Sequence, residues 1–146
     1  VMYQTYLITG ATGFLGRAVL QLLLAHSCRI LALVMDKDPL AYTIPENVTV
    51  FCGDLTDKDT LRSFFAAGGD NFCVLHCAGI VSVASKPDEA IYRVNVQGTQ
   101  NIIDLCCEFG AEKLVYVSSV HAIAEKPAPQ TITEPNHFSP DDILGD

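Results

Sequence analysis

Three glycines at a junction between an apolar segment and a helical segment constrain the fold of this chain more than any other feature. Gly10, Gly13 and Gly16 recur at every third position in the string TGATGFLG, directly after the apolar run at 3–9. Such spacing allows a tight turn, a close approach of the backbone to a pyrophosphate and close packing of a helix on the preceding strand. The start of that helix offers unpaired N–H groups and a positive dipole to phosphates. The spacing therefore predicts a dinucleotide-binding unit rather than a purely structural turn.

Apolar segments and segments with helical periodicity alternate along the rest of the chain. Further strands are predicted at 29–34, 48–52, 72–76 and 114–118, and helices at 13–26, 57–67 and 87–109. Nearly all-apolar strands separated by helices are typical of a parallel sheet that is covered on both faces. With right-handed crossovers, this alternation predicts an α/β fold with a Rossmann-like, doubly wound parallel sheet in the strand order 3-2-1-4-5.

The C-terminal part of the chain has a different character. Four of the seven prolines lie between 125 and 146, where no periodicity is sustained and no closing helix or strand is found. We therefore expect a dinucleotide-binding Rossmann domain over residues 1–122 and the start of an active-site or substrate loop over 123–146. On this interpretation the chain is truncated and its sheet is incomplete at the C-terminus.

Composition excludes several classes of partner. The 146 residues carry 9 Lys and Arg against 17 Asp and Glu without a basic cluster, which argues against binding nucleic acid or an anionic membrane. No apolar run is long enough to span a bilayer, and the residues before the first strand leave no room for a signal sequence. The six cysteines lack C-x-x-C spacing, which favours reduced core cysteines in a cytoplasmic protein over disulfides or a metal site. We expect a small-molecule partner and leave homodimer formation open.

Four further motifs follow the glycine string in order. They are Gly53-Asp54-Leu55, His76-Cys77-Ala78-Gly79, YRVNVQGTQN at 92–101 and VYVSS at 115–119. Together the five motifs resemble those of the extended short-chain dehydrogenase/reductase family, which includes NAD-dependent epimerases and dehydratases and dihydroflavonol-reductase-like enzymes. The resemblance extends from about residue 6 to residue 122. It implies NAD or NADP as the cofactor and hydride transfer to or from a carbonyl or secondary-alcohol carbon as the reaction.

The resemblance also assigns roles to individual residues. Asp54 would meet the adenine amine, Ser119 would hydrogen-bond the substrate carbonyl, and Asn95 would hold the active-site backbone and a water. Ser119 and Asn95 are therefore the candidate catalytic residues. The candidate cofactor-binding residues are Gly10, Thr12, Gly13, Phe14, Leu15, Gly16, Asp36, Lys37, Asp54, Leu55, Cys77, Ala78, Gly79, Asn95, Val117 and Ser118.

Several of these residues have a structural alternative. Asp54 could simply cap the turn that follows it, and Ser118 and Ser119 could be helix caps. His76 is interpreted as a packed residue at a strand end rather than as a base or ligand, because no second metal-type ligand accompanies it. Gly98 lies inside a predicted helix, where glycine is unfavourable, so close packing against a neighbouring element is expected there.

The sequence leaves the choice between NAD and NADP open. An acidic residue about 20 positions beyond the glycines normally binds the ribose 2′-hydroxyl of NAD, whereas basic residues accept the phosphate of NADP. Asp36 lies 20 positions after Gly16, but Lys37 follows it directly. In the family pattern Val34 and Met35 stand where a discriminating Asp or Arg is usual.

One expected element of the family is absent. The family uses a Tyr-x-x-x-Lys pair as its acid/base, and none of the five tyrosines has a lysine four residues later. The chain alone is therefore expected to be inactive, as the cofactor portion of a larger oxidoreductase. Two alternatives are a nucleotide-sugar epimerase or dehydratase with tightly held NAD, and a non-catalytic NADP-binding regulatory protein. The string VHAI at 120–123 and the loop at 80–82 are closer to the dihydroflavonol-reductase and hydroxysteroid-dehydrogenase-like branch.

Overall fold

The strands of the chain form a single parallel sheet. The computed structural model describes residues 3–81, 89–124 and 126–134. The strands are β1 (Thr5–Thr9), β2 (Arg29–Val34), β3 (Thr49–Cys52), β4 (Phe72–His76) and β5 (Lys113–Tyr116). Their order is β3-β2-β1-β4-β5 and every neighbouring pair is parallel. The predicted Rossmann-like fold and its strand order are confirmed.

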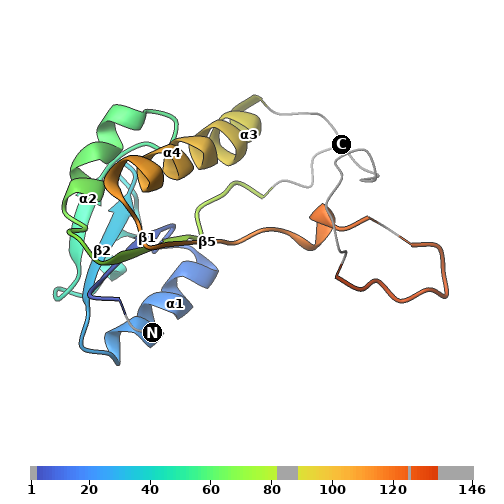
Figure 1. Cartoon of the computed structure of the whole chain (residues 1–146), viewed down its shortest axis with the longest axis horizontal. Helices are drawn as coiled ribbons and strands as arrows, with labels where there is room; N and C mark the ends of the chain where they lie inside the picture. The colour runs from blue at the N-terminus through green and yellow to red at the C-terminus, as the bar shows by residue number, and fades with distance from the viewer. Residues whose placement is uncertain (1–2, 82–88, 125, 135–146) are drawn as a thin grey trace.

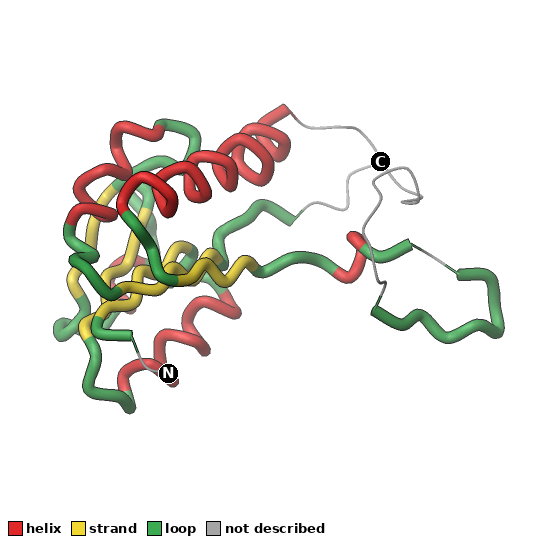
Figure 2. Tube along the Cα trace, in the orientation of Figure 1, coloured by secondary structure: helices red, strands yellow, loops and turns green. Residues whose placement is uncertain are grey.

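Helices cover both faces of this sheet. Figure 1 shows α1 (Phe14–Leu24) on one face and the other main helices on the opposite face. The second group consists of the 3-10 turn η2 (Lys58–Leu61) with α2 (Arg62–Ala66), and of a long helix made of α3 (Glu89–Tyr92), the π-helical segment η3 (Arg93–Gly98) and α4 (Thr99–Phe109). Two short turns, η1 (Ala41–Thr43) and η4 (Val120–Ala122), lie in loop regions (Figure 2).

The central strands β1, β2 and β4 are buried on both faces because each face of the sheet has its own hydrophobic core, whereas the edge strands β3 and β5 are largely exposed. Successive side chains of a strand point to opposite faces, so the neighbours Leu7 and Ile8 enter different cores. Leu7 packs in a cluster with Phe64 and Leu105 from α2 and α4, whereas Ile8 packs in a cluster with Leu20 of α1. Because every neighbouring pair of strands is parallel, the carboxyl ends of all five strands lie at one edge of the sheet.

Element boundaries depart from the sequence prediction in several places. The predicted helix 57–67 is a 3-10 turn followed by α2, and Asp57 caps it by accepting the Asp59 N–H at 3.2 Å. The predicted helix 87–109 begins among the described residues at Glu89 and contains the π-helical segment; Pro87 lies outside the described residues. Helix α1 ends at Leu24, and β5 runs from Lys113 to Tyr116, so Ser118 lies beyond it.

The six cysteines differ in their exposure to solvent. The expectation of core cysteines holds for Cys73 and Cys106 but is wrong for Cys52 and Cys107, which are exposed. Cys52 lies on the edge strand β3, and Cys107 follows the inward-facing Cys106 around the helix, about 100° away.

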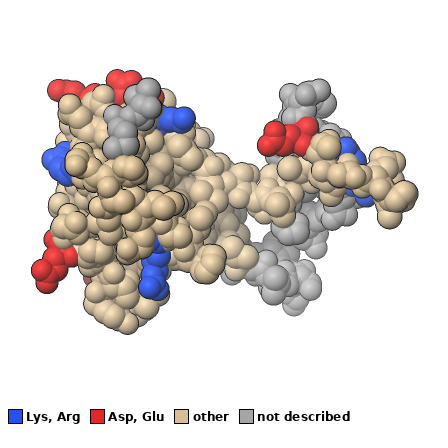
Figure 3. Space-filling view, turned by 90° about the horizontal axis from the view of Figure 1, so that it is seen from below, with Lys and Arg blue, Asp and Glu red and all other residues tan. Residues whose placement is uncertain are grey.

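In the face seen in Figure 3, Lys and Arg side chains are scattered singly. No helix in the described part of the chain is both long and apolar enough to cross a membrane.

The chain beyond β5 leaves the packed body. Figure 1 shows it running outward from the sheet, with η4 as its first regular turn. The domain boundary predicted at residue 122 falls at the end of this turn and stays a prediction, because residue 125 and residues 135–146 lie outside the described part.

Candidate functional site

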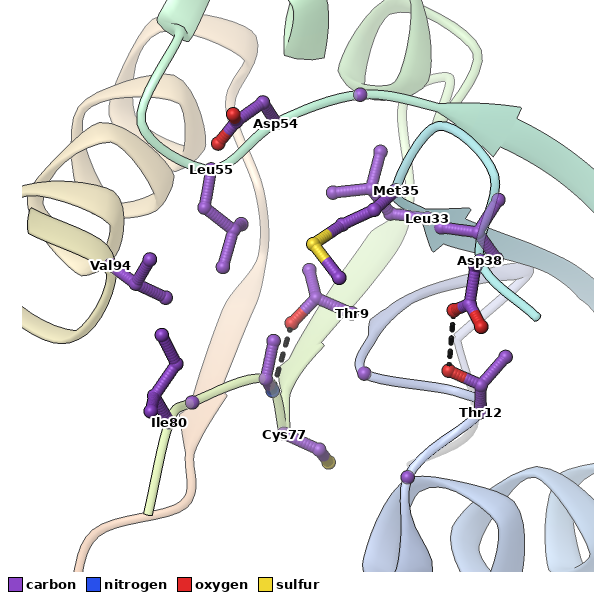
Figure 4. Close-up of a pocket in the computed structure, with 16 residues that line it drawn as sticks. Thr9, Thr12, Leu33, Met35, Asp38, Asp54, Leu55, Cys77, Ile80 and Val94 are labelled. Carbon is purple, nitrogen blue, oxygen red and sulfur yellow. Dashed lines mark hydrogen bonds between the residues drawn. The ribbon is translucent and has the colours of Figure 1, made fainter. Parts of the chain in front are cut away.

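A pocket of about 290 Å³ opens at the carboxyl edge of the sheet. It lies between the ends of β1, β2 and β4, where the strand order changes direction, which is the usual ligand position in open α/β sheets. Its walls come from four turns and from the long helix (Figure 4). The lining residues are Thr9, Gly10, Thr12, Gly13, Leu33, Val34, Met35, Asp38, Gly53, Asp54, Leu55, Cys77, Ala78, Gly79, Ile80 and Val94.

The glycine-rich turn after β1 forms one wall and can exist only with glycine at two positions. Gly10 has φ +70°, and a Cβ there would lie 2.7 Å from the Ala78 N atom. A Cβ on Gly16 would overlap the carbonyl oxygen of Gly10. Because both contacts involve backbone, neither could be relieved by a side-chain movement. The close turn predicted from the glycine spacing is therefore present.

The start of α1 presents backbone N–H groups that the helix itself leaves unpaired. Gly13 is the N-cap, its N–H donates to the Gly10 carbonyl at 3.0 Å, and no side chain caps this helix. The Arg17 N–H is the next to find a partner, the Gly13 carbonyl at 3.0 Å. The N–H groups of residues 14–16 thus remain for an external acceptor, and no acidic residue lies in the first turn. Phe14 and Leu15 expose their side chains and do not line the pocket, so what they offer to the site is their backbone N–H groups.

The loop after β2 brings Asp38 to the pocket in place of Asp36. Lys37 has φ +59°, which reverses the chain direction between the two carboxylates. Asp36 and Lys37 side chains are 81% and 90% exposed, lie 3.9 Å apart and do not line the pocket. The Asp38 Oδ2 instead accepts the Thr12 hydroxyl at 2.8 Å (Figure 4). Its Oδ1 accepts the Leu40 N–H at 2.8 Å. Sequence reasoning missed Asp38, although the Asp38-Pro39 pair was a turn signal.

The turn after β3 carries Asp54 and Leu55. The Gly53 N–H donates to the Val34 carbonyl at 2.9 Å, which continues the β2–β3 pairing into the turn. Asp54 Oδ1 accepts both the N–H and the hydroxyl of Thr56 at 2.8 Å, so the capping alternative is realised, and Asp54 also lines the pocket. Leu55 is buried at the base of this wall.

The long helix holds the turn after β3 in place through two of its residues. The Asn101 Nδ2 donates to the Leu55 carbonyl at 2.8 Å. A Cβ on Gly98 would lie 2.9 Å from the Leu55 Cβ, so only glycine allows this approach. The close packing expected for Gly98 is thereby confirmed, and Asn101 gains a role that the sequence had not indicated.

The same helix holds the turn after β4, which forms the opposite wall. Asn95 accepts the Ile80 N–H through Oδ1 and donates to the Ile80 carbonyl through Nδ2, both at 2.8 Å. Asn95 itself does not line the pocket. It lies in the π-helical segment η3, and such segments are frequent at functional sites.

His76, at the end of β4, is buried beneath that turn. Its ring nitrogens lie 2.7 Å from the Thr9 hydroxyl and 3.0 Å from the Thr99 hydroxyl, and its ring stacks on Tyr116. Burial lowers the pKa of His76 to about 4, so the imidazole is neutral at ordinary pH. The interpretation of His76 as a packed strand-end residue is confirmed. Its partner Thr99 was missed, because a helix threonine gives no sequence signal for such a bond.

The predicted residues after β5 do not join the pocket. The Val117 N–H continues the sheet by donating to the His76 carbonyl at 3.0 Å, and the Ser119 carbonyl accepts the Ala122 N–H at 3.0 Å. Val117, Ser118 and Ser119 are absent from the lining. Within the described residues there is no cluster of three or more His, Cys, Asp or Glu side chains suited to a metal ion.

Comparison with known proteins places this geometry in a family. The chain matches the 3-beta hydroxysteroid dehydrogenase/isomerase family over residues 7–141. It is 39% identical over 125 residues to 3 beta-hydroxysteroid dehydrogenase type 7 of Rattus norvegicus, an alignment that covers 81% of this chain and 36% of that protein. It is 32% identical over 149 residues to a putative dihydroflavonol 4-reductase of Synechocystis sp., covering 99% and 41%.

Solved structures share the fold. The UDP-glucose 4-epimerase of Thermus thermophilus in complex with NAD superposes with a TM-score of 0.77 at 27% identity, covering 89% of this chain and 42% of that one. The structure of gox2253 gives a TM-score of 0.80 at 33% identity, covering 97% and 42%. The chain thus spans about two fifths or less of the length of these relatives.

The resemblance drawn from the five motifs is confirmed by these matches, and the family match extends over nearly the whole chain. The expectation of a nicotinamide dinucleotide agrees with the NAD complex of the Thermus epimerase. The chain belongs to the 3-beta hydroxysteroid dehydrogenase/isomerase family.

Proposed function

We propose that this chain is the NAD(P)-binding portion of an oxidoreductase that transfers hydride between a nicotinamide cofactor and a carbonyl or secondary-alcohol carbon. The observation that carries the proposal is the glycine turn at the pocket. Its backbone approaches Ala78 too closely for any side chain at Gly10, and the adjoining start of α1 leaves the N–H groups of residues 14–16 without helix partners. That combination suits a pyrophosphate.

The pocket walls suggest how the dinucleotide lies. Its pyrophosphate would rest on residues 10–15, where backbone donors converge. Its adenine would lie between the apolar side chains of Leu33 and Leu55, with the Asp54 carboxylate at the edge able to accept the adenine amine. The remaining part would extend past the turn at residues 77–79 toward the chain beyond β5.

Asp38 supports NAD over NADP as the cofactor. Its carboxylate already accepts two hydrogen bonds, and a carboxylate has further lone pairs that a ribose 2′-hydroxyl can use. A 2′-phosphate at the same place would meet a like charge, which costs on the order of 1–4 kcal/mol at a distance of about 4 Å. Lys37 is turned outward beside Asp36, away from the pocket lining. We therefore assign the discriminating role to Asp38.

Catalysis in the complete enzyme is proposed to use Ser119 on the substrate oxygen, with Asn95 acting on the backbone near the site. Ser119 follows the carboxyl end of β5, on the edge where open α/β sheets place ligands. The chain itself contains no Tyr-x-x-x-Lys pair, so residues 1–146 alone are expected not to turn over. A cytoplasmic location stays a prediction.

Family membership favours a secondary-alcohol substrate of the hydroxysteroid type. Both the family description and the rat relative name that chemistry. A nucleotide-sugar epimerase is the second candidate, because the NAD-bound Thermus epimerase superposes over 89% of the chain. The two differ in cofactor exchange: an epimerase retains its nicotinamide during purification, whereas a dehydrogenase releases it.

The proposal is tested by calorimetric titration of the protein with NAD, NADP and ADP-ribose. ADP-ribose lacks the nicotinamide ring but carries every group assigned to this pocket. It should bind with an affinity close to that of NAD, and NADP should bind more weakly. If none of the three bound at millimolar concentration, the assignment of the pocket would be wrong.

A further inference from the structure

Three side chains form a buried row of hydrogen bonds behind the pocket wall. His76 is 1% exposed and lies between Thr9 on β1 and Thr99 at the start of α4. Its Nδ1 is 2.7 Å from the Thr9 Oγ1, and its Nε2 is 3.0 Å from the Thr99 Oγ1. The Thr9 Oγ1 also accepts the N–H of Ala78 at 3.3 Å, and Ala78 is part of the pocket lining. The row thus connects a helix on one face of the sheet to a backbone group of the pocket.

The hydrogen positions in this row follow from the donors available. A hydroxyl has one hydrogen, and the Thr9 side chain is completely buried, so leaving that hydrogen without an acceptor would be costly. If the Thr9 hydroxyl donates to Nδ1, its lone pairs stay available for the Ala78 N–H and Nε2–H donates to Thr99. The opposite assignment makes Thr9 accept both the Ala78 N–H and Nδ1–H, and its own hydrogen then has no acceptor in the row. In the first arrangement the hydrogen without an acceptor in the row belongs to Thr99, which is only partly buried, whereas Thr9 is completely buried, so the first arrangement costs less.

The turn that this row supports has little freedom to move. A Cβ on Gly10 would already lie 2.7 Å from the Ala78 N atom, so the two backbone segments are in direct contact. At its far end the turn is held by Asn95 through Ile80. Between these two ends, the Ala78 N–H donates to the Thr9 Oγ1, and the same oxygen lies 2.7 Å from the His76 Nδ1.

We propose that His76 is a positioning residue for cofactor binding: as the Nε2–H tautomer it accepts the Thr9 hydroxyl and thereby directs the Thr9 oxygen toward the Ala78 N–H. This inference rests on the proposed function in that it takes the pocket as the dinucleotide site. His76 does not act as an acid or base here, because it is buried, lies outside the pocket lining and uses both ring nitrogens within the protein.

The tautomer can be measured without any cofactor. In ¹⁵N-labelled protein, the two imidazole nitrogens of His76 have different chemical shifts, and the nitrogen that bears hydrogen is identified directly. The inference expects Nε2–H, together with slow hydrogen exchange at the Ala78 amide. A Nδ1–H tautomer, or a charged ring at neutral pH, would overturn it.

A matched pair of variants tests the link to the cofactor. His76→Asn keeps an oxygen near the Nδ1 position that can accept the Thr9 hydroxyl, whereas His76→Leu removes every acceptor. His76→Leu should weaken NAD binding by roughly fivefold to tenfold and accelerate exchange at the Ala78 amide, as expected for the loss of one buried hydrogen bond. His76→Asn should restore most of both. His26→Leu, at an exposed histidine in the turn after α1, is the control for the substitution itself.

The outcomes separate the two claims. If wild-type protein failed to bind NAD, the proposed function would fail, while the tautomer and the Ala78 exchange would still decide the arrangement of the row. If wild type bound NAD and folded His76→Leu bound it equally well, the positioning role would be wrong and the pocket assignment would stand. If His76→Leu did not fold, the positioning role of His76 would be decided by the tautomer measurement and by the comparison of His76→Asn with wild type.

Discussion

The side-chain amide of Asn95 makes two hydrogen bonds to the backbone of Ile80: its Oδ1 accepts the Ile80 N–H and its Nδ2 donates to the Ile80 carbonyl, each at 2.8 Å. A side-chain amide supplies a donor and an acceptor in one plane on the same carbon, as this pairing requires. A Cβ added to Gly79 would lie 3.4 Å from the same Oδ1, so Asn95 also lies close to the residue before Ile80. The asparagine thus acts on the pocket wall through the backbone.

Replacing Asn95 should therefore weaken cofactor binding without removing a direct contact. Asn95→Leu leaves the Ile80 N–H and carbonyl without partners, and the turn at residues 77–80 should become mobile. We expect NAD affinity to fall about tenfold, which corresponds to about 1.4 kcal/mol. Calorimetry measures the affinity, and amide exchange at Ile80 reports on the turn. Gln97→Leu, an exposed position in the same π-helical segment, is the control and should bind NAD as wild type does.

Gly98→Ala should destabilise the protein, against the usual effect of that substitution in a helix. Alanine normally stabilises a helix relative to glycine by about 0.5–1 kcal/mol. Here the added Cβ would meet the Leu55 Cβ at 2.9 Å and push the helix from the turn that carries Asp54. We expect the free energy of unfolding to decrease by about 1–3 kcal/mol in urea denaturation. A stabilised Gly98→Ala protein would show that the helix can move away from Leu55 at no cost.

The cofactor preference should depend on Asp38 and not on Asp36. Asp38→Ala removes the carboxylate that borders the pocket, so the ratio of NAD to NADP affinity should fall by roughly tenfold. Asp36→Ala changes the same charge two residues away, where the side chain is exposed, and should leave the ratio within about twofold. Titration of both variants with both cofactors measures the two ratios. The reverse pattern would return the role to Asp36, as the sequence spacing alone had indicated.

Stability should depend on pH through His76. Its pKa is lowered by burial from 6.5 to about 4 in the folded protein, so the unfolded chain takes up a proton first as the pH falls. The contribution of the neutral His76 to the free energy of unfolding is therefore complete above about pH 6.5. It is lost as the pH falls from 6.5 to 4, by roughly 3 kcal/mol in all. Urea denaturation at about pH 7.5 and about pH 5 should show this decline in wild type and a smaller one in His76→Asn.

The matched control for this pH dependence is His26→Asn, since His26 is exposed. That variant should keep the decline seen in wild type. If His76→Asn lost stability between the two pH values as steeply as wild type does, the decline would have to come from other groups, and the buried neutral state of His76 would not be its cause.

The fold was predictable because its signals are local and repeated. Each strand is an apolar run, each crossover contains a helical segment, and the triplet Gly10, Gly13 and Gly16 marks the first junction. Together with right-handed crossovers, these patterns determine the order β3-β2-β1-β4-β5. The location of the pocket follows from that order, because ligands bind where the strand sequence reverses.

The details of the site were less predictable because they depend on tertiary contacts. The choice of Asp38 over Asp36 follows from the positive φ of Lys37, a conformation that a lysine adopts only under constraint from its surroundings. The π-helical segment around Asn95 has no distinct periodicity in sequence. The pairing of His76 with Thr99 joins residues 23 positions apart, from a strand and a helix, and neither residue indicates the other.

The central claim is that the pyrophosphate of a nicotinamide dinucleotide lies over the glycine turn, and Gly13→Val tests it most directly. Gly13 has φ −75° and ψ 171°, which valine can adopt, and its added Cβ would meet only the Gly10 carbonyl at 3.3 Å, so the variant should fold. Ala18→Val, at an exposed position of α1, is the matched control. Calorimetric titration with NAD should show at least a tenfold loss of affinity in Gly13→Val and wild-type affinity in Ala18→Val. A folded Gly13→Val protein that bound NAD as tightly as wild type would contradict the account.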